Sequence, residues 1–369
     1  MRCGPSSEFS RGRRLEEAQR TQLTKKAPRR TIGVHMTKVD VVVPCYNYGR
    51  FLEACVRSVL EQSLTDLRVL IIDDASSDDT LAIATGLAGR DPRVSVISHP
   101  QNWGHIRTYN QGIEWASADY FLLLSADDLL LPGALKRATM IMDENSDIVL
   151  AHGNCVVWND ELPLPDRTDR QSDKWERQDL IKDSCVMGDI VVYDATAIVR
   201  TSVQKKIGGY LESLPHCADL EIWLRFAVHG AVAYITAAQA IYRKHASAMT
   251  RSYCFTVFGC QQRRQAFDMF FENYGGYRAD LRTLRAQAQK KVAKLTFRDG
   301  IDHLRRGRIS IGLQLLYLAI DQDPQLKFCP PFWWLFRFPG PEGRRWAASV
   351  VKRETIRLVR GAQPGRKSA

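Results

Sequence analysis

Apolar and polar positions alternate along residues 39–151 in a pattern that predicts strands separated by amphipathic helices. Short apolar runs, several of them β-branched, predict five strands at 39–43, 68–72, 94–97, 120–124 and 148–151. Helical spacing predicts four helices between them, at 50–62, 77–86, 106–116 and 132–143. Strands that alternate with helices are typical of a mainly parallel α/β sheet, in which ligands bind beyond the carboxyl ends of the strands.

The pattern changes beyond residue 151. Residues 155–190 are rich in Asp, Arg, Pro and Trp and predict an insertion loop. Strand character returns at 194–200 and 233–235, a helix is expected at 220–229, and long helices are expected at 255–273 and 281–306. We therefore expect three regions, namely a disordered basic segment at 1–37, an α/β domain at 38–250, and a helical, basic region at 251–369.

The charge of the chain is concentrated at its two ends. The net charge is +11, with ten Lys and Arg against three Glu in residues 1–38 and ten against two in residues 325–369. The intervening residues are slightly acidic, which argues against a nucleic-acid partner for the folded part. No run of 18 apolar residues and no apolar core near the N-terminus occur, so we expect neither a spanning helix nor a secretory signal. A cytoplasmic protein is expected, and Met36 is a candidate translation start.

Cysteine spacing and the absence of phosphate-loop motifs exclude several other classes. The nine cysteines form no C-x-x-C pair and are odd in number, which disfavours a zinc knuckle and a disulfide scaffold. Neither G-x-G-x-x-G nor G-K-[ST] occurs, which disfavours a dinucleotide oxidoreductase and a P-loop enzyme.

Carboxylates directly follow two of the predicted strands. Asp73 and Asp74 follow the second strand, where they suit recognition of a nucleotide ribose or base. Asp127 and Asp128 follow the fourth strand, where adjacent carboxylates are hard ligands for Mg²⁺ or Mn²⁺. In both places the alternative is a turn and a cap for the next helix, and the sequence leaves it open.

Further polar residues that could take part in catalysis or binding occur later in the chain. Asp219 begins a predicted helix and has no partner at helical spacing, whereas Glu221 and Arg225 are four apart and predict a pair at the surface or behind the site. We expect Trp223 in the core. His245 follows a strand and suits a metal ligand, a phosphate contact or a structural role.

Seven segments together resemble the family 2 glycosyltransferases with the GT-A fold, in the order and spacing of that family. They are VVVPCYN at 41–47, IIDDASSD at 71–78, N-x-G-x5-N-x-G at 102–112, SADD at 125–128, GGY at 208–210, DLEIWLR at 219–225 and YR-x-H at 242–245. The resemblance implies an inverting transferase that takes a sugar from a nucleotide donor, most often a UDP-sugar.

The resemblance also implies roles for individual residues. It assigns Asp219 as the general base, and it assigns Asp127, Asp128 and His245 to a Mn²⁺ or Mg²⁺ ion. The nucleotide would be bound by Pro44, Tyr46, Asn47, Asp73, Asp74, Asn102, Asn110 and Asp127. Ser125 and Ala218 depart from the family pattern, which usually has acidic residues there, so a catalytically degenerate GT-A-like binding protein is the alternative.

The acceptor side is less defined by the sequence. By resemblance, the acceptor is a hydroxyl of a cell-surface glycan or a lipid-linked glycan in polysaccharide biosynthesis of the cell envelope. Residues 328–338 combine two Trp with several Phe and precede a basic stretch. They suit peripheral contact with the inner face of the plasma membrane, or packing against the catalytic domain.

Overall fold

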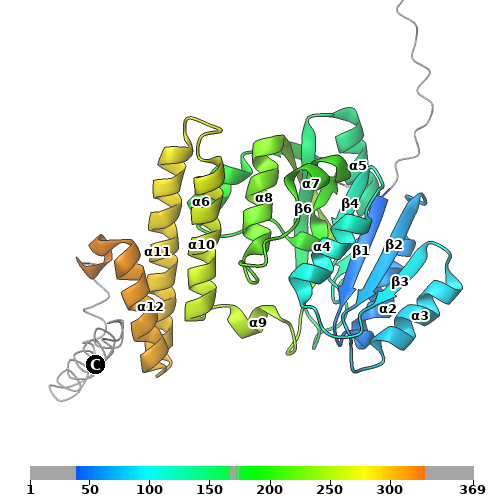
Figure 1. The fold of residues 1–369 in the computed structure, drawn as a ribbon, viewed down its shortest axis with the longest axis horizontal. Helices are drawn as coiled ribbons and strands as arrows, with labels where there is room; N and C mark the ends of the chain where they lie inside the picture. Colours follow the sequence, from blue (N-terminus) through cyan, green and yellow to red (C-terminus); the bar gives the residue numbers. More distant parts are fainter. Residues whose placement is uncertain (1–38, 167–171, 173, 329–369) are drawn as a thin grey trace, which may run out of the picture. The chain divides into compact units, whose positions relative to one another are not determined.

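The computed structural model describes residues 39–166, 172 and 174–328 (Figure 1). The predicted disordered segment and the predicted basic C-terminal stretch lie outside these residues, as does nearly all of the aromatic segment at 328–338. No helix in the described ranges combines the length and the apolar character needed to cross a bilayer.

The first half of the fold follows the predicted alternation. Its strands are β1 (Val39–Cys45), β2 (Leu67–Asp73), β3 (Val94–Ser98) and β4 (Tyr120–Leu123). Its helices are α2 (Gly49–Leu60), α3 (Thr80–Arg90) and α4 (His105–Trp115). Strand β1 lies between β2 and β4, and β2 pairs with β3, with every one of these pairings parallel. The predicted strand and helix positions here are confirmed to within a few residues.

The second half completes a mixed sheet. Its elements are β5 (Leu129–Leu130), α5 (Ala134–Glu144), β6 (Ile148–Asn159), β7 (Trp175–Gln178), α6 (Leu180–Met187), the 3₁₀ turn η1 (Asp194–Thr196), β8 (Ile198–Arg200), α7 (Thr201–Ile207), α8 (Ala218–His229) and β9 (Ala231–Lys244). The strand order is β3-β2-β1-β4-β8-β6-β9-β5, with β7 paired to β9. Strands β5, β7 and β8 each pair antiparallel while β6 and β9 pair parallel, so the sheet is the expected mixed sheet and its antiparallel strands lie in this half.

The expected insertion loop at 155–190 is wrong at both ends. Strand β6 continues to Asn159 alongside β9, and β7 and α6 occupy the later part of that segment. Between them, residues 160–166 form a turn and irregular backbone, as a loop would.

Alternating residues of the central strands supply two separate cores, one on each face of the sheet. Val41 and Val43 pack with α2 and α3, whereas Val42 belongs to the cluster that includes α4 and α8. Both faces of β1 are covered, which explains why its sequence is a nearly continuous run of β-branched residues. This rigid centre holds the strand ends in fixed positions.

Helices dominate the chain after β9. They are α9 (Thr250–Tyr253), α10 (Val257–Tyr274), α11 (Leu281–Arg305), α12 (Ile309–Gln322) and the short turn η2 (Pro324–Phe328). Phe267 and Phe270 of α10 join the same core cluster as Trp223 of α8, and α11 packs along α6 and α12 (Figure 1). The helical region therefore shares a core with the sheet, and its division from the α/β domain at residue 250 stays a prediction.

The described cysteines are all free thiols, and Cys45, Cys55, Cys185 and Cys260 are buried. Burial raises the pKa of the Cys185 thiol to about 12, which keeps it protonated and unreactive.

Candidate active site

The loop after β1 meets the loop after β2 at one edge of the sheet. Asn47 adopts a positive φ of 57°, and its side-chain oxygen accepts the backbone N–H of Ser77 at 2.8 Å. Its own N–H donates to the Ser76 hydroxyl at 2.9 Å. Asn has access to this left-handed conformation at lower cost than most residues. Tyr46 beside it is 49% exposed, so its ring is available to a ligand.

Asp73 and Asp74 at the end of β2 have different environments. Asp74 accepts the N–H groups of Trp103 at 2.7 Å and Gly104 at 2.9 Å, and it also contacts His99 at 2.7 Å. It therefore anchors the loop that leads into α4. Asp73 accepts one longer hydrogen bond at each oxygen, from the N–H of Ser76 at 3.3 Å and from the hydroxyl of Ser98 at 3.2 Å. Neither residue caps α3, whose N-cap is Asp79, so the capping alternative is wrong here.

The two predicted nucleotide-binding asparagines also separate by environment. Asn102 is exposed near this edge, and its side chain accepts the N–H of Gly104 at 3.0 Å. Asn110 instead pairs both ends of its amide with the backbone of Tyr210, at 2.7 and 2.9 Å. Asn110 thus ties α4 to the loop before α8, and its role as a nucleotide ligand stays a prediction.

Replacing Asn110 with Ala is expected to lower the free energy of unfolding by about 1–3 kcal/mol, because the buried N–H and C=O of Tyr210 lose their partners. The midpoint of denaturant unfolding measures this loss. The matched control is Asn102→Ala, for which we expect a change within about 0.5 kcal/mol at an exposed site. Equal stability of the two variants would contradict the structural role of Asn110.

Asp127 and Asp128 lie where β9 meets the loop after β4. Oδ2 of Asp127 lies 2.9 Å from Nε2 of His245, which comes 118 residues later in the chain. Oδ1 of Asp128 accepts the N–H of Arg243 at 3.0 Å. The Arg243 guanidinium donates to the main-chain oxygen of Asp127 at 2.8 Å and stacks on Phe51 and Trp158, and its charge also acts on the Asp127 and Asp128 carboxylates.

The electrostatics of this acid pair favour a cation. Burial raises the pKa of Asp128 well above its usual value, and the like charge of Asp127 raises it further. The helix cap at this place is Gly133, so the capping alternative is wrong for Asp127 and Asp128. No group of three or more His, Cys, Asp or Glu side chains in the described residues is arranged as a complete metal ligand set.

A second acidic centre lies at the start of α8. Burial raises the pKa of Asp219 to about 8, and the like charge of Asp194 adds to the rise. Oδ1 of Asp219 accepts only the N–H of the adjacent Leu220, and no ion pair to this carboxyl exists among the described residues. Asp194 in η1 accepts the indole N–H of Trp223 at 2.8 Å, while burial raises the pKa of Asp194 to about 6.

Charges from both acidic centres raise the pKa of the same tyrosine, Tyr109. Burial raises the pKa of Tyr109 in α4 well above its usual value, and the charges of Asp194, Asp127 and Asp219 each raise it further. Charges carried by the loop after β4, by η1 and by α8 therefore all act on this residue of α4. Asp194 was not foreseen from the sequence, because its segment has strand character and contains no recognisable motif.

The pair formed by Glu221 and Arg225 is buried rather than at the surface. Their side chains are 1% and 6% exposed and lie 2.7 Å apart. Arg225 also donates to the carbonyls of Ile207 and Gly209 at 2.7 Å each. The pair thus fixes the loop before α8, which positions Asp219, and Trp223 lies in the core as expected.

Solved structures with the same architecture identify the fold. The chain superposes on the crystal structure of S. aureus TarS 1-349 in complex with UDP-GlcNAc with a TM-score of 0.52 and 16% sequence identity, over 79% of this chain and 92% of that one. The fold is that of the GT-A glycosyltransferases, as expected.

Sequence comparison then shows which family the chain resembles. Residues 40–199 match the model of glycosyl transferase family 2. It is 24% identical over 220 residues to an uncharacterized glycosyltransferase of Haemophilus influenzae, covering 58% of this chain and 68% of the relative. It is 34% identical over 124 residues to the GalNAc(5)-diNAcBac-PP-undecaprenol beta-1,3-glucosyltransferase of Campylobacter jejuni, covering 33% of this chain and 39% of that protein.

Proposed function

We propose that this protein transfers a sugar from a nucleoside diphosphate donor, a UDP-sugar, to a hydroxyl of a glycan or lipid-linked acceptor, with inversion at the anomeric carbon. The observation that carries this proposal is the contact of Asp127 with His245, which comes 118 residues later in the chain, at 2.9 Å. The charges of Asp127 and Asp219 both act on Tyr109, which supports a base near this pair.

The donor would occupy the edge formed by the loops after β1 and β2. Asp73 has acceptor capacity for a ribose hydroxyl or a base N–H, and the exposed Tyr46 and Asn102 flank it. Asp74 would act indirectly, by fixing the backbone at Trp103 and Gly104. Pro44 and Asn47 shape the same edge through the turn after β1.

Asp127 and His245 fit a divalent cation as a pair, because a carboxylate oxygen and an imidazole nitrogen both suit Mn²⁺. The raised pKa of Asp128 supports a cation here, since two close carboxylates are stabilised by positive charge. Such an ion usually takes its remaining ligands from substrate phosphates and water. When bound, Mn²⁺ or Mg²⁺ would stabilise negative charge on the departing diphosphate.

Asp219 is the proposed general base. Its second carboxylate oxygen is not engaged by the described residues, so it can accept a proton from an acceptor hydroxyl. Burial raises the pKa of Asp219 to about 8, so a large fraction is protonated at neutral pH. Transfer should therefore accelerate as pH rises towards 8, where the carboxylate becomes the main form.

Replacing Asp194 with Asn is expected to move this rise in rate to lower pH by about 1 unit, because it removes a like charge from Asp219 while Asp189 remains. The pH profile of kcat/KM measures the shift. Asn keeps an oxygen for the indole N–H of Trp223, so the fold should persist. An unchanged profile in a folded variant would contradict the coupling of the two acids.

Binding of nucleoside diphosphates tests the proposed donor class. UDP with Mn²⁺ at about a hundredfold excess over its Kd is expected to raise Tm by about 5 °C, because it binds only the folded protein. Thermal unfolding with UDP, dTDP and GDP measures the preference. No stabilisation by any of the three would contradict the proposed donor site.

A further inference from the structure

Beyond the donor site, we propose that a basic cavity between the end of β9 and helices α11 and α12 binds phosphate groups carried by the acceptor. This inference rests on the proposed function, since it assigns a chemical class to the acceptor of the same enzyme. The shared chemistry is a phosphate ester, whether in a lipid-linked diphosphate or in a phosphodiester polymer.

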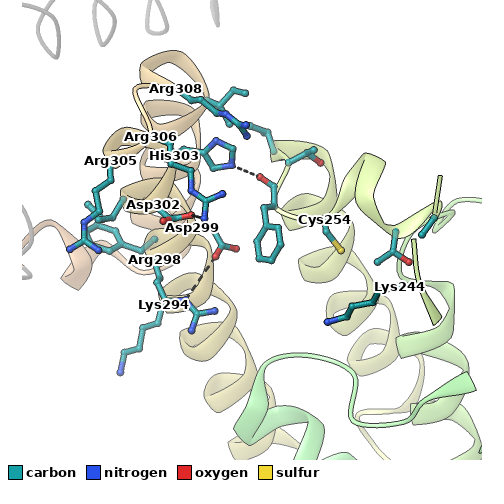
Figure 2. Close-up of a pocket in the computed structure, with 18 of the residues that line it drawn as sticks. Lys244, Cys254, Lys294, Arg298, Asp299, Asp302, His303, Arg305, Arg306 and Arg308 are labelled. Atoms are coloured by element: carbon teal, nitrogen blue, oxygen red, sulfur yellow. Dashed lines mark hydrogen bonds and ion pairs between the residues drawn. The ribbon is translucent and has the colours of Figure 1, made fainter. Parts of the chain in front are cut away.

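The cavity has a volume of about 1260 Å³, and basic side chains dominate its charged lining. The basic residues are Lys244, Lys294, Arg298, Arg305, Arg306 and Arg308, against the acidic Asp299 and Asp302. Figure 2 shows Lys244 and Cys254 on one side of the cavity and the basic residues of α11 on the other. Such a concave concentration of positive charge attracts and retains anions.

Part of this positive charge is not neutralised within the protein. Arg306 pairs with Asp302 at 2.8 Å, and Arg298 approaches Asp299 at 3.9 Å. Lys244, Lys294 and Arg308 form no ion pair among the described residues. An anion in the cavity would therefore have a cation of β9 on one side and cations of α11 and of Arg308 on the other. The N-terminal end of α12 adds its own favourable dipole.

The cavity lies beside the proposed metal pair. His245 lines it and contacts Asp127 at 2.9 Å. Cys254 also lines it, and the charge of Asp219 is among those that raise the pKa of its thiol, after burial. The donor-side acids Asp73 and Asp74 do not line it. A ligand in the cavity would therefore lie next to the Asp127–His245 pair and outside the proposed ribose and base site.

The lining is suited to more than the phosphate alone. Phe255 is 58% exposed, and Ile311 at the start of α12 is 38% exposed. The carbonyl of Phe255 accepts a hydrogen bond from His303 at 2.9 Å, which fixes the segment between α9 and α10 against α11 (Figure 2). Apolar surface beside the cations would pack against the carbon skeleton of a phosphate-bearing acceptor.

Tripolyphosphate, in buffer with EDTA, is the first probe of the cavity in the full-length protein. Calorimetry is expected to detect binding to the wild type, and Lys294→Glu and Arg298→Glu should each weaken it by about tenfold. Lys290→Glu is the matched control, since Lys290 is exposed on the same helix but does not line the cavity. It should bind within about twofold of the wild type.

A second arm measures acceptor kinetics and separates the two sources of phosphate. One acceptor is a glycan joined to a short isoprenoid through diphosphate, and the other is a soluble polyol-phosphate oligomer. In Arg298→Glu the KM of the true acceptor class is expected to rise about tenfold, while the KM for the donor in nucleotide-sugar hydrolysis stays unchanged. The acceptor that responds identifies the source.

The inference is overturned if the two cavity variants bind tripolyphosphate as the wild type does, or if neither acceptor responds to Arg298→Glu. It is also overturned if saturating UDP displaces tripolyphosphate, because the anion would then occupy the donor site. Failure of UDP to bind the wild type would count against the proposed function instead, and tripolyphosphate binding would still decide the cavity.

Discussion

Asp219→Asn is expected to reduce sugar transfer by about 10²–10⁴-fold, because the amide cannot accept the proton of the attacking hydroxyl. The substitution is nearly isosteric, and its side-chain oxygen can still accept the N–H of Leu220. Donor binding should be largely retained, since Asp219 belongs to α8, whereas the loops after β1 and β2 form the proposed donor edge. Initial rates of transfer and the affinity for UDP with Mn²⁺ measure the two effects separately.

The matched control for this variant is Asp189→Asn. Asp189 is another carboxylate whose charge reaches Asp219, but it pairs with Arg263 at 3.2 Å. We expect its rate to stay within about threefold of the wild type, because Asp189 is not the group that accepts the acceptor proton and Asn keeps an oxygen for the N–H of Ile190. Full transfer activity in Asp219→Asn would remove this residue from the role of base.

Asp127→Asn is expected to lower transfer by about 10²–10³-fold, as several kcal/mol of charge stabilisation on the leaving diphosphate are lost. The concentration of Mn²⁺ needed for half-maximal activity should rise at the same time. Stability should not fall, because the substitution removes a like charge from the buried Asp128. Activity titrated with Mn²⁺, together with the unfolding midpoint, measures both consequences.

Asp160→Asn serves as the control for that variant. The charge of Asp160, like that of Asp127, raises the pKa of Arg243, but Asp160 makes no hydrogen bond or ion pair with His245 among the described residues. Its metal dependence should match that of the wild type. If Asp127→Asn kept the wild-type response to Mn²⁺, the assignment of Asp127 and His245 to the cation would be wrong.

The first half of the fold was readable from the sequence because its strands are buried on both faces. The apolar run at Val39–Val43, followed by apolar residues at helical spacing, predicts a buried strand and then a helix. The second half was less readable, because β7 and β8 are short and pair antiparallel with distant partners. Their register depends on tertiary contacts that no local pattern carries.

The site was predictable where carboxylates follow strands and less so elsewhere. Asp127 and His245, far apart in sequence, do meet. Asp74 and Asn110 matched motifs, yet their polar groups hold backbone segments, and only the folded structure shows which polar atoms are already paired. Asp194 escaped notice because a single Asp in a β-branched stretch gives no signal until α8 packs beside it.

Release of nucleoside diphosphate from a panel of UDP-, dTDP- and GDP-sugars, with Mn²⁺ and then with EDTA, tests the central claim most directly. We expect the wild type to release the nucleotide from at least one donor, most readily a UDP-sugar, and to lose this activity when the metal is removed. Donor binding without any release, with acceptor glycans present, would contradict the claim and favour a catalytically degenerate binding protein.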